Sequence, residues 1–312
     1  MKRVAGLSPL FAALAVSFST LAATAGSGSV AVAADSPDKT AADASTRVVD
    51  SKNVPQTTKT SDGRELKLVW NDEFDGEGAP DPEKWGYEIG YIRNNEAQYY
   101  TDRVENVFQK DGALTIRTLK EKFPIAGKPA SKGREEAEYT SGSINTLGKA
   151  GWLYGRVEVR ARLPKGKGIW PAIWMMGTNI REIGWPRCGE IDIMEYVGKE
   201  PGRVYGTIHM RRRGAEPWKN VSKGNNVEPG NPEGRFCVYA LEWTEDKLTI
   251  LVDETVVLEF LRSEEEGKTD VWPFDKPHYL LINTAIGGAW GGEIADDVCP
   301  TDYLIDYVRV YQ

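Results

Sequence analysis

Apolar and polar residues alternate with a period of two along much of the chain. In YGRVEVRARL (154–163), an apolar residue at every second position alternates with arginine or glutamate. Side chains two residues apart lie on the same face of a β-strand, so this pattern predicts a half-buried strand. The segment KLTILVDETVVLEF (247–260) predicts a hairpin that turns at Asp253 and Glu254.

Several shorter segments have the same character. Strands are predicted at 66–70, 113–118, 204–209, 236–243, 278–286 and 303–311. Glycine and proline clusters separate these segments, and no long segment shows the 3.6-residue apolar period of a helix. Many short strands with few helices are typical of an all-β, two-sheet sandwich of the β-jelly-roll type.

Three acids interrupt the apolar pattern in GEIDIMEYVG (189–198). Glu190 and Asp192 share one face of the predicted strand, whereas regular pairing would turn Glu195 to the opposite face. A β-bulge, with Met194 as the surplus residue, would return Glu195 to the face of the other two acids. The sequence therefore predicts three carboxylates in a row on one face of a sheet.

Such a row suits glycoside hydrolysis. Retaining glycosidases use two carboxyl groups roughly 5–5.5 Å apart, one as nucleophile and one as acid/base. Four effective strand steps of ~3.3 Å place the backbones of Glu190 and Glu195 about 13 Å apart, and inward-leaning side chains would close this gap. Asp192 between them can share a proton with a neighbouring carboxylate. The alternative is an exposed acidic strand, but the apolar residues Ile191 and Ile193 favour an internal one.

The first 65 residues differ in composition from the rest. Lys2 and Arg3 precede an apolar run and an A-x-A-like site at 31–34, which predicts a secretory signal peptide over residues 1–34. An N-terminal membrane anchor is the alternative. Residues 35–65 are polar and small, so a flexible leader is expected there. Residues 66–312 are expected to form one domain.

The net charge and the small number of histidines and cysteines limit the classes of partner and of site that the chain can have. The net charge of −7 argues against a nucleic-acid partner. Two histidines and three cysteines leave few residues for a zinc site or a catalytic triad. His278 is expected in the core or on the surface. The three cysteines are expected either to form one disulfide and leave one free thiol, or to remain unpaired. They are Cys188, Cys237 and Cys299.

Aromatic and polar residues around the acids are candidates for sugar binding. Trp170 and Trp174 share a strand face just before the acids, and Trp290 lies in a glycine-rich loop. Asn95 belongs to the polar loop NNEAQYYT (94–101), and His209 lies on the strand after the acids. Each tryptophan can instead be a core residue, and His209 can be a buried, hydrogen-bonded histidine.

These motifs resemble family-16 glycoside hydrolases, in particular laminarinase-type endo-β-1,3-glucanases. GEIDIME after WPAIWMM has the bulged E-x-D-x-x-E form of that family's signature. The similarity spans almost all of 66–312 and also includes WNDEFDG (70–76), NNEAQYYTDRVENV (94–107), YTSGSINT (139–146), YGRVEVRARLPKGKGIWPAIWMM (154–176), WPFDKPHYLLINTAIGGAW (272–290) and DYVRVYQ (306–312).

The resemblance implies a jelly roll with an open substrate cleft across its concave sheet. It implies Glu190 as nucleophile, Asp192 as its helper and Glu195 as general acid/base, with no cofactor for catalysis. It further implies a structural calcium ion away from the cleft, at Glu73, the backbone of Gly112, and Asp306.

Two departures from the family pattern leave more than one substrate class possible. Arg211–Arg213 form a more basic loop than such enzymes usually carry, which suits either a sulfated glycan or a solvated loop. Gly288-Ala289-Trp290 stands where relatives often read GGNW, so a polar ligand contact is expected to be missing. The bulged motif disfavours the mixed-linkage glucanase subgroup, whose motif is one residue shorter.

We therefore expect a secreted (extracellular or periplasmic), monomeric, endo-acting retaining hydrolase of laminarin-like β-1,3-glucan, with no membrane association after signal removal. The alternatives are a hydrolase of agar-type, carrageenan-type or sulfated galactans, and a non-catalytic glucan-binding protein. Transglycosylation would use the same residues.

Overall fold

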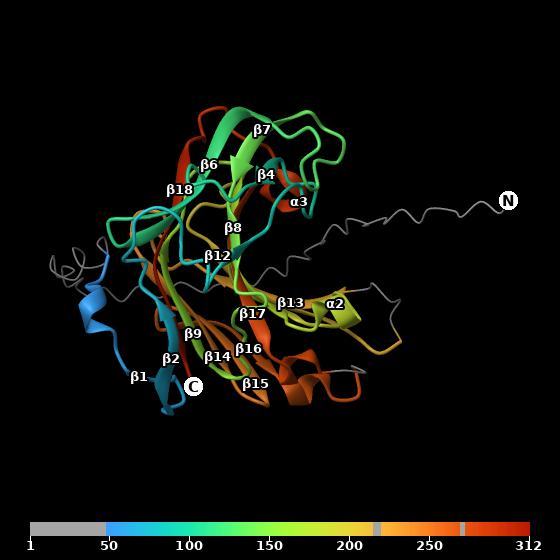
Figure 1. Cartoon of the computed structure of the whole chain (residues 1–312). Coiled ribbons are helices and arrows are strands. Elements are labelled where there is room, and N and C mark those ends of the chain that lie inside the picture. The colour runs from blue at the N-terminus through green and yellow to red at the C-terminus, as the bar shows by residue number, and fades with distance from the viewer. Residues whose placement is uncertain (1–47, 215–219, 269–271) are drawn as a thin grey trace, which may run out of the picture.

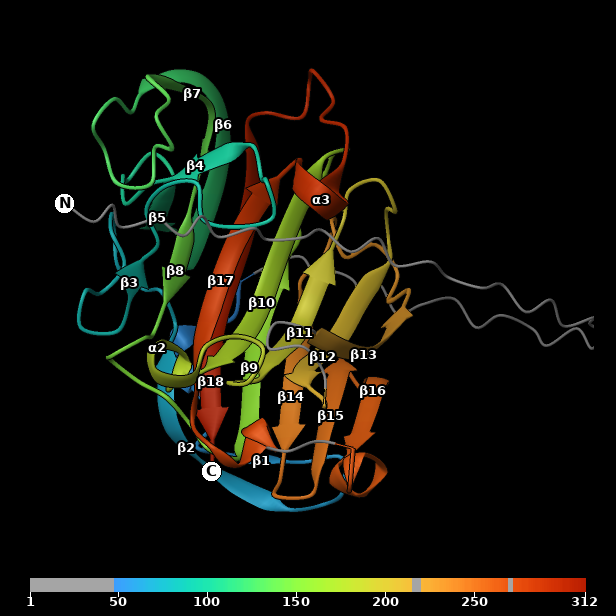
Figure 2. The ribbon, with the colours of Figure 1, turned by 90° about the vertical axis from the view of Figure 1, so that its right-hand side faces the viewer.

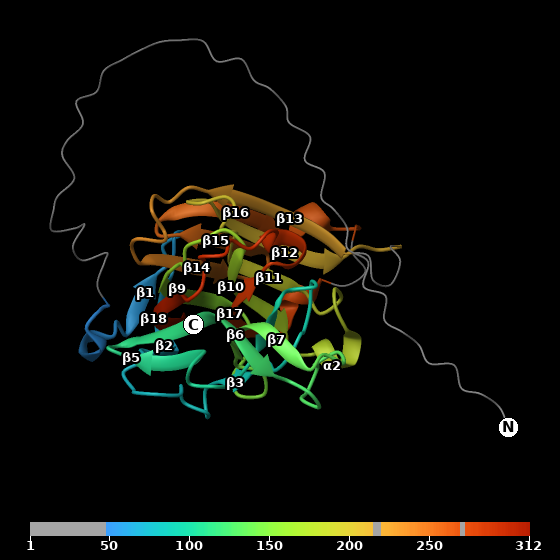
Figure 3. The same cartoon turned by 90° about the horizontal axis from the view of Figure 1, so that it is seen from above.

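The computed structural model describes residues 48–214, 220–268 and 272–312. Two β-sheets pack face to face in these residues, and loops of varied length connect them (Figures 1 and 3). The two-sheet jelly-roll sandwich predicted from the alternating pattern is confirmed. The predicted signal peptide and residues 35–47 of the predicted leader lie outside the described residues. Within the described part, no helix is both long and apolar enough to cross a membrane.

The outer sheet has eleven strands. Eight follow the order β16-β15-β14-β9-β18-β6-β7-β4, while β1 and β2 extend it beside β18, and β5 pairs with β6. All pairs are antiparallel except β4 with β7. The strands are β1 (Thr57–Lys59), β2 (Glu65–Asp72), β4 (Gln98–Tyr100), β5 (Val107–Lys110), β6 (Ala113–Pro124), β7 (Glu136–Ser141), β9 (Gly155–Arg162), β14 (Cys237–Trp243), β15 (Lys247–Val252), β16 (Thr255–Leu261) and β18 (Thr301–Tyr311).

The inner sheet has seven strands in the order β13-β12-β11-β10-β17-β8-β3, and Figure 2 shows most of them side by side. These strands are β3 (Gly86–Tyr87), β8 (Ser143–Asn145), β10 (Ile169–Gly177), β11 (Glu190–Tyr196), β12 (Val204–Arg211), β13 (Asn220–Val227) and β17 (His278–Ile286). The described helices are single turns: η1 (Ser51–Asn53), α2 (Ile180–Ile183), η2 (Arg262–Glu265), η3 (Pro273–Asp275) and α3 (Gly288–Gly291).

The core lies between the two sheets, where most strands direct apolar side chains inward. Strand β17 has the same bounds as the sequence prediction, 278–286. Strands β15 and β16 form the predicted hairpin, with Asp253 and Glu254 at its turn. Asp253 has a φ of 52°, a left-handed conformation that aspartate tolerates in turns.

The predicted β-bulge is present in β11. Between Asp192 and Glu195, two residues of β11 face a single residue, Gly206, of β12. The register with β10 pairs Met194 with Ile173, so the unpaired surplus residue is Ile193 rather than the predicted Met194. Both residues are fully buried in the core. Gly206 suits this place because a Cβ there would lie 2.8 Å from Cγ2 of Ile250.

Strand β9 is more buried than its alternation predicted. Arg156, Glu158 and Arg160 lie on the face away from the core, yet each is less than 9% exposed. Arg156 pairs with Glu158 at 2.6 Å and with Glu242 of β14. The half-buried assignment is wrong here because a network of ion pairs covers this outer face, which a single-strand pattern cannot reveal.

The described part of the predicted flexible leader belongs to the sandwich. Strand β1 pairs with β2 in a regular antiparallel register. The amide of Ser61 donates to Glu242 Oε1 at 2.8 Å, and the amide of Val49 donates to Asp306 Oδ1 at 3.1 Å. The domain therefore includes residues before 66, because their backbone groups find partners on the outer sheet.

Candidate active site

The bulge places the three acids in one cleft on the inner sheet. Glu190, Asp192 and Glu195 all line a cavity of about 310 Å³. Asp192 is buried and the two glutamates are half-buried, whereas the residues between them point into the core. The arrangement is the one that the sequence predicted, with three carboxylates on one face.

His209 lies beside the central acid. Strand β12 pairs with β11 so that His209 is opposite Glu190, and its Nε2 lies 3.0 Å from Asp192 Oδ2. The other ring nitrogen, Nδ1, lies 2.7 Å from the side-chain nitrogen of Asn220 on β13. His209 is therefore a partner of the acids, as one of the two sequence readings proposed.

Burial and like charges shift the protonation of this cluster. Burial, together with the Asp192 charge, raises the pKa of Glu195 to about 8. Burial and the Glu190 charge raise the pKa of Asp192 to about 7. The carboxylates around His209, chiefly Asp192, outweigh its burial and raise its pKa to about 10. A glutamic acid that stays protonated at neutral pH beside an ion pair is suited to donate a proton.

Each glutamate accepts a hydrogen bond from an indole. Trp170 Nε1 on β10 donates to Glu195 Oε1 at 3.0 Å. Trp185 Nε1, in the loop between α2 and β11, donates to Glu190 Oε2. The sequence analysis did not single out Trp185, although it stands five residues before Glu190 in GWPRCGE.

Aromatic rings form one wall of the cleft. The rings of Trp170 and Trp290 meet edge to face at 5.6 Å, and Tyr205 meets Trp290 at 5.0 Å. The backbone holds Trp290 in place because the Ala289 amide donates to the Asn94 carbonyl at 2.9 Å. Trp170 and Trp290 therefore line the cleft, and their binding of a sugar stays a prediction.

Trp174 also lines the cleft, but one face of its indole is covered. The guanidinium carbon of Arg93 lies 4.9 Å from the ring centroid, and Arg93 pairs with Glu88. The indole N–H of Trp174 donates to Asn283 Oδ1 at 2.8 Å. At this place a ligand therefore meets a guanidinium and an amide as well as the indole edge.

The loop before β4 supplies different residues from the one predicted. Asn94 and Glu96 line the cleft, whereas Asn95 is not among the lining residues. Glu96 is buried, and burial raises its pKa although Gln98 donates to it at 2.7 Å. Alternation could not predict which asparagine faces inward, because Asn94 and Asn95 both have left-handed φ values of 52° and 53°.

The predicted calcium ligands do not form a cation site. Both carboxylate oxygens of Glu73 accept from Arg309, at 2.9 and 2.7 Å. Asp306 pairs with Arg160 and accepts from the Val49 amide. Gly112 has a left-handed φ of 77° and lies near Val48. Guanidinium groups occupy the side-chain oxygens that calcium would need, so these residues do not fit the ion.

One group of acid and histidine side chains has the close spacing of a metal site. In the described ranges, the one set of three whose donor atoms all lie within 4.8 Å of one another is Glu190, Asp192 and His209. These residues already pair within the cleft and belong to the acid cluster.

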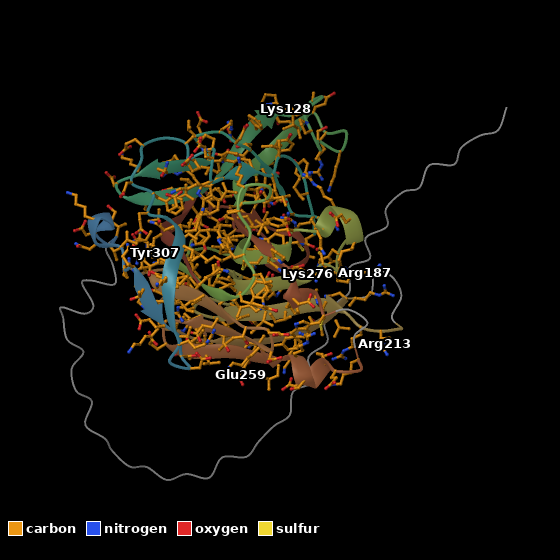
Figure 4. All side chains as sticks on the ribbon, turned by 60° about the horizontal axis from the view of Figure 1, so that its bottom comes forward. Lys128, Arg187, Arg213, Glu259, Lys276 and Tyr307 are labelled. Carbon is orange, nitrogen blue, oxygen red and sulfur yellow. The ribbon has the colours of Figure 1, made fainter. Side chains whose placement is uncertain are left out.

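The cysteines resolve one open alternative, whereas the role of the basic loop stays a prediction. Cys188, Cys237 and Cys299 are all free thiols, so the reading without a disulfide holds. Arg212 forms two hydrogen bonds with Glu265, at 3.1 and 3.0 Å, and Arg213 is exposed at the periphery (Figure 4).

Comparisons with known proteins agree with this site. The model of glycosyl hydrolases family 16 matches residues 94–309. A β-glucanase from Rhodothermus marinus is 41% identical over 256 residues, which are 79% of this chain and 85% of that protein. The X-ray structure of an endo-β-1,3-glucanase from Pyrococcus furiosus superposes with a TM-score of 0.73 at 36% identity, covering 83% of this chain and 98% of the other.

A keratan-sulfate endo-1,4-β-galactosidase from Sphingobacterium multivorum is more distant, at 33% identity over 279 residues, which are 88% of this chain and 60% of that protein. The extent of the family match, the two-sheet sandwich and the three acids lead to one conclusion: the chain belongs to family 16 of the glycosyl hydrolases and is a glycosidase.

Proposed function

We propose that the protein is a secreted, endo-acting hydrolase that cleaves β-1,3-glucan with retention of configuration. One observation supports this most strongly: the bulge in β11 aligns Glu190, Asp192 and Glu195 in a cleft with an aromatic wall. The relatives named as β-glucanases add support for the substrate class. Residues 1–34, with their signal-peptide pattern, support secretion.

In this mechanism each acid has one role. Glu195 protonates the departing glycosidic oxygen while Glu190 attacks the anomeric carbon and forms a glycosyl ester. Glu195, now a carboxylate, then removes a proton from water, which adds to the anomeric carbon and releases Glu190. Asp192 supports both steps, because its charge raises the pKa of Glu195 and its pairing with His209 fixes its position.

The first test compares the wild type with Glu190→Gln on laminarin. We expect reducing-sugar release by the wild type and a loss of at least about a thousandfold in the variant, because the amide cannot form the ester. Proton NMR should show the β-anomer as the first product. Glu293→Gln is the matched control, since Glu293 is exposed and its ion pair within the described residues is with Lys167, at 2.6 Å. Comparable activity of the Glu190 variant and the wild type would refute the nucleophile assignment.

A second substrate class is supported by one relative. The keratan-sulfate endo-β-galactosidase is similar over most of this chain, and Arg93 adds a cation to the cleft. The loop at Arg211–Arg213 adds less support, because Arg212 pairs with Glu265. Assays on laminarin, mixed-linkage glucan, agarose and keratan sulfate would separate the classes. Cleavage of keratan sulfate alone would keep the mechanism and replace the substrate.

A non-catalytic glucan-binding role receives no support from the site, since all three acids are present and aligned. Binding of laminarin by the wild type without any product release would restore that alternative.

A further inference from the structure

The two glutamates of the proposed mechanism share an unusual feature, an indole N–H donor aimed at one oxygen of each. Trp170 Nε1 contacts Oε1 of Glu195 at 3.0 Å. Trp185 Nε1 contacts Oε2 of Glu190. Among the residues that the structure describes, no indole contacts the other oxygen of either carboxyl group, so the two oxygens of each group are not equivalent.

Both indoles are held in place by packing. Trp185 lies against a buried cluster that includes Met176, Cys188 and Tyr279. The ring of Trp170 meets that of Trp290 at an interplanar angle of 86°. Donors fixed in this way need no reorganisation when charge develops on the carboxyl groups.

The chemistry of the indole assigns the reacting oxygens. Its N–H is a donor and never an acceptor, so the oxygen that it contacts must offer a lone pair. When Glu195 is protonated, its proton therefore resides on Oε2, and Oε1 accepts from Trp170. In Glu190 the Trp185 contact engages Oε2, which leaves Oε1 for attack.

We propose that Trp170 and Trp185 are positioning residues that decide which oxygen of each glutamate reacts. The proton on Glu195 Oε2 moves to the glycosidic oxygen as its bond to the anomeric carbon breaks, and Glu190 Oε1 forms the new bond. In the second step a water proton returns to Glu195 Oε2, the water oxygen bonds to the anomeric carbon, and the ester bond to Glu190 breaks. This inference rests on the proposed function.

The Trp170 contact also changes in strength during the reaction. Hydrogen bonds to ionised acceptors are stronger than those to neutral ones. The contact therefore stabilises Glu195 more after it has lost its proton, and it lowers the pKa that burial and Asp192 raise. Removing this donor should make Glu195 a weaker acid.

The test uses Trp170→Phe and Trp185→Phe, with Trp174→Phe as the matched control. Trp174 lines the same cleft, but its N–H donates to Asn283 and to neither glutamate. Each variant is assayed on laminarin and on a dinitrophenyl β-glycoside of a short β-1,3-glucan oligosaccharide, whose leaving group needs no protonation.

We expect different signatures from the two variants. Trp170→Phe should lose about tenfold or more in kcat on laminarin but little on the dinitrophenyl glycoside. The alkaline limb of its pH profile should move to higher pH by about one unit. Trp185→Phe should lose about tenfold or more on both substrates, because attack is impaired in each. Trp174→Phe should raise KM and leave the alkaline limb in place.

An unchanged alkaline limb and an unchanged ratio of the two substrates in Trp170→Phe would overturn the assignment for Glu195. Recovery of Trp185→Phe on the dinitrophenyl glycoside, or an effect on KM alone, would overturn it for Glu190. If a phenylalanine variant does not fold, the benzothiophene isostere of tryptophan, in which sulfur replaces the ring N–H, is introduced at the same position with the same expected outcomes.

Failure of the proposed function would give a different result from failure of the tryptophan inference. It would appear as full activity of Glu190→Gln or as no cleavage by the wild type. The tryptophan inference is judged only from ratios between variants and an active wild type.

Discussion

Burial and neighbouring charges together raise the pKa values of Asp192 and Glu195 in the cleft. Glu195 receives opposite influences, since the Asp192 charge raises its pKa and the charge of His209 lowers it. Asp192 in turn lies 3.0 Å from His209, which couples the three groups. Single substitutions at these positions should therefore move the pH profile in opposite directions.

Asp192→Asn removes a negative charge beside Glu195. The pKa of Glu195, raised to about 8 by burial and by this charge, should fall. Because Glu195 must be protonated to act as an acid, we expect the alkaline limb of kcat/KM to move down by about one pH unit, with a loss of about tenfold or more in kcat. The measurement is kcat/KM on laminarin between pH 5 and 10.

His209→Gln supplies the opposite comparison. This substitution removes a positive charge, so the alkaline limb should move up. Shifts of the same sign in Asp192→Asn and His209→Gln would contradict the electrostatic account of Glu195.

At the scale of the element, the bulge in β11 reconciles three acids with a buried strand. Ile193 and Met194 both enter the core, and Glu195 resumes the cleft face. Opposite them, Gly206 has no side chain, and a Cβ at this position would lie 2.8 Å from Cγ2 of Ile250. The strand can therefore satisfy the core and the active site at the same time, at the expense of one unpaired position.

Deleting Met194 should give a regular strand in which Glu190, Asp192 and Glu195 still alternate onto the cleft face. Deleting Ile191 removes an equally buried residue but separates Glu190 from the face of Asp192. We expect both proteins to be destabilised by about 2–5 kcal/mol, as for other lost core side chains. The Met194 deletion should keep at least about tenfold more laminarin activity than the Ile191 deletion. Thermal unfolding gives the Tm of each protein, and activity is then measured at a temperature below the lower of the two Tm values.

The reverse order of activities in two folded proteins would show that the bulge is not what aligns Glu195.

At the scale of the whole molecule, the two sheets meet around aromatic residues that join them. His278 of β17 in the inner sheet packs edge to face on Trp243 of β14 in the outer sheet, with ring centroids 5.2 Å apart. It is fully buried, and Nδ1 lies 2.9 Å from the Lys276 carbonyl. Its core position confirms one of the two sequence readings. Burial lowers the pKa of His278 from 6.5 to about 4.

His278 should make the protein sensitive to acid. Its folded pKa is below its unfolded value, so the unfolded chain binds the proton first and stability falls as the pH drops from about 6.5 toward 4. The loss should approach about 3 kcal/mol over that range. In His278→Gln this component is absent, so the difference in unfolding free energy between wild type and variant should shrink by about 2–3 kcal/mol between pH 7 and 4.5. Urea unfolding at both pH values measures it.

Parallel losses of stability in the two proteins between pH 7 and 4.5 would assign the acid sensitivity to other groups.

Local sequence patterns predicted the fold class and the row of three acids. A period of two in segments such as 154–163 and 278–286 predicted strands, because residues on one face of a strand share one environment. The parity of Glu190, Asp192 and Glu195 required an irregularity among apolar residues, so the bulge itself was predictable. The Asp253-Glu254 turn followed from the two apolar runs that flank it.

Contacts between distant segments could not be predicted from the sequence. Arg309 pairs with Glu73, and Arg160 pairs with Asp306. These ion pairs join segments far apart in the chain, which is why the expected calcium ligands are engaged elsewhere. The choice of Asn94 over Asn95 in the cleft depends on left-handed backbone conformations that alternation does not encode.

The sequence by itself determined the sandwich, the three acids and their common face, because each depends on spacing within a single strand. Only the tertiary structure decided which donor meets which carboxyl oxygen. Trp170 and Trp185 reach Glu195 and Glu190 from a neighbouring strand and a loop. Such meetings depend on register and packing between elements, and these are fixed when the whole chain folds.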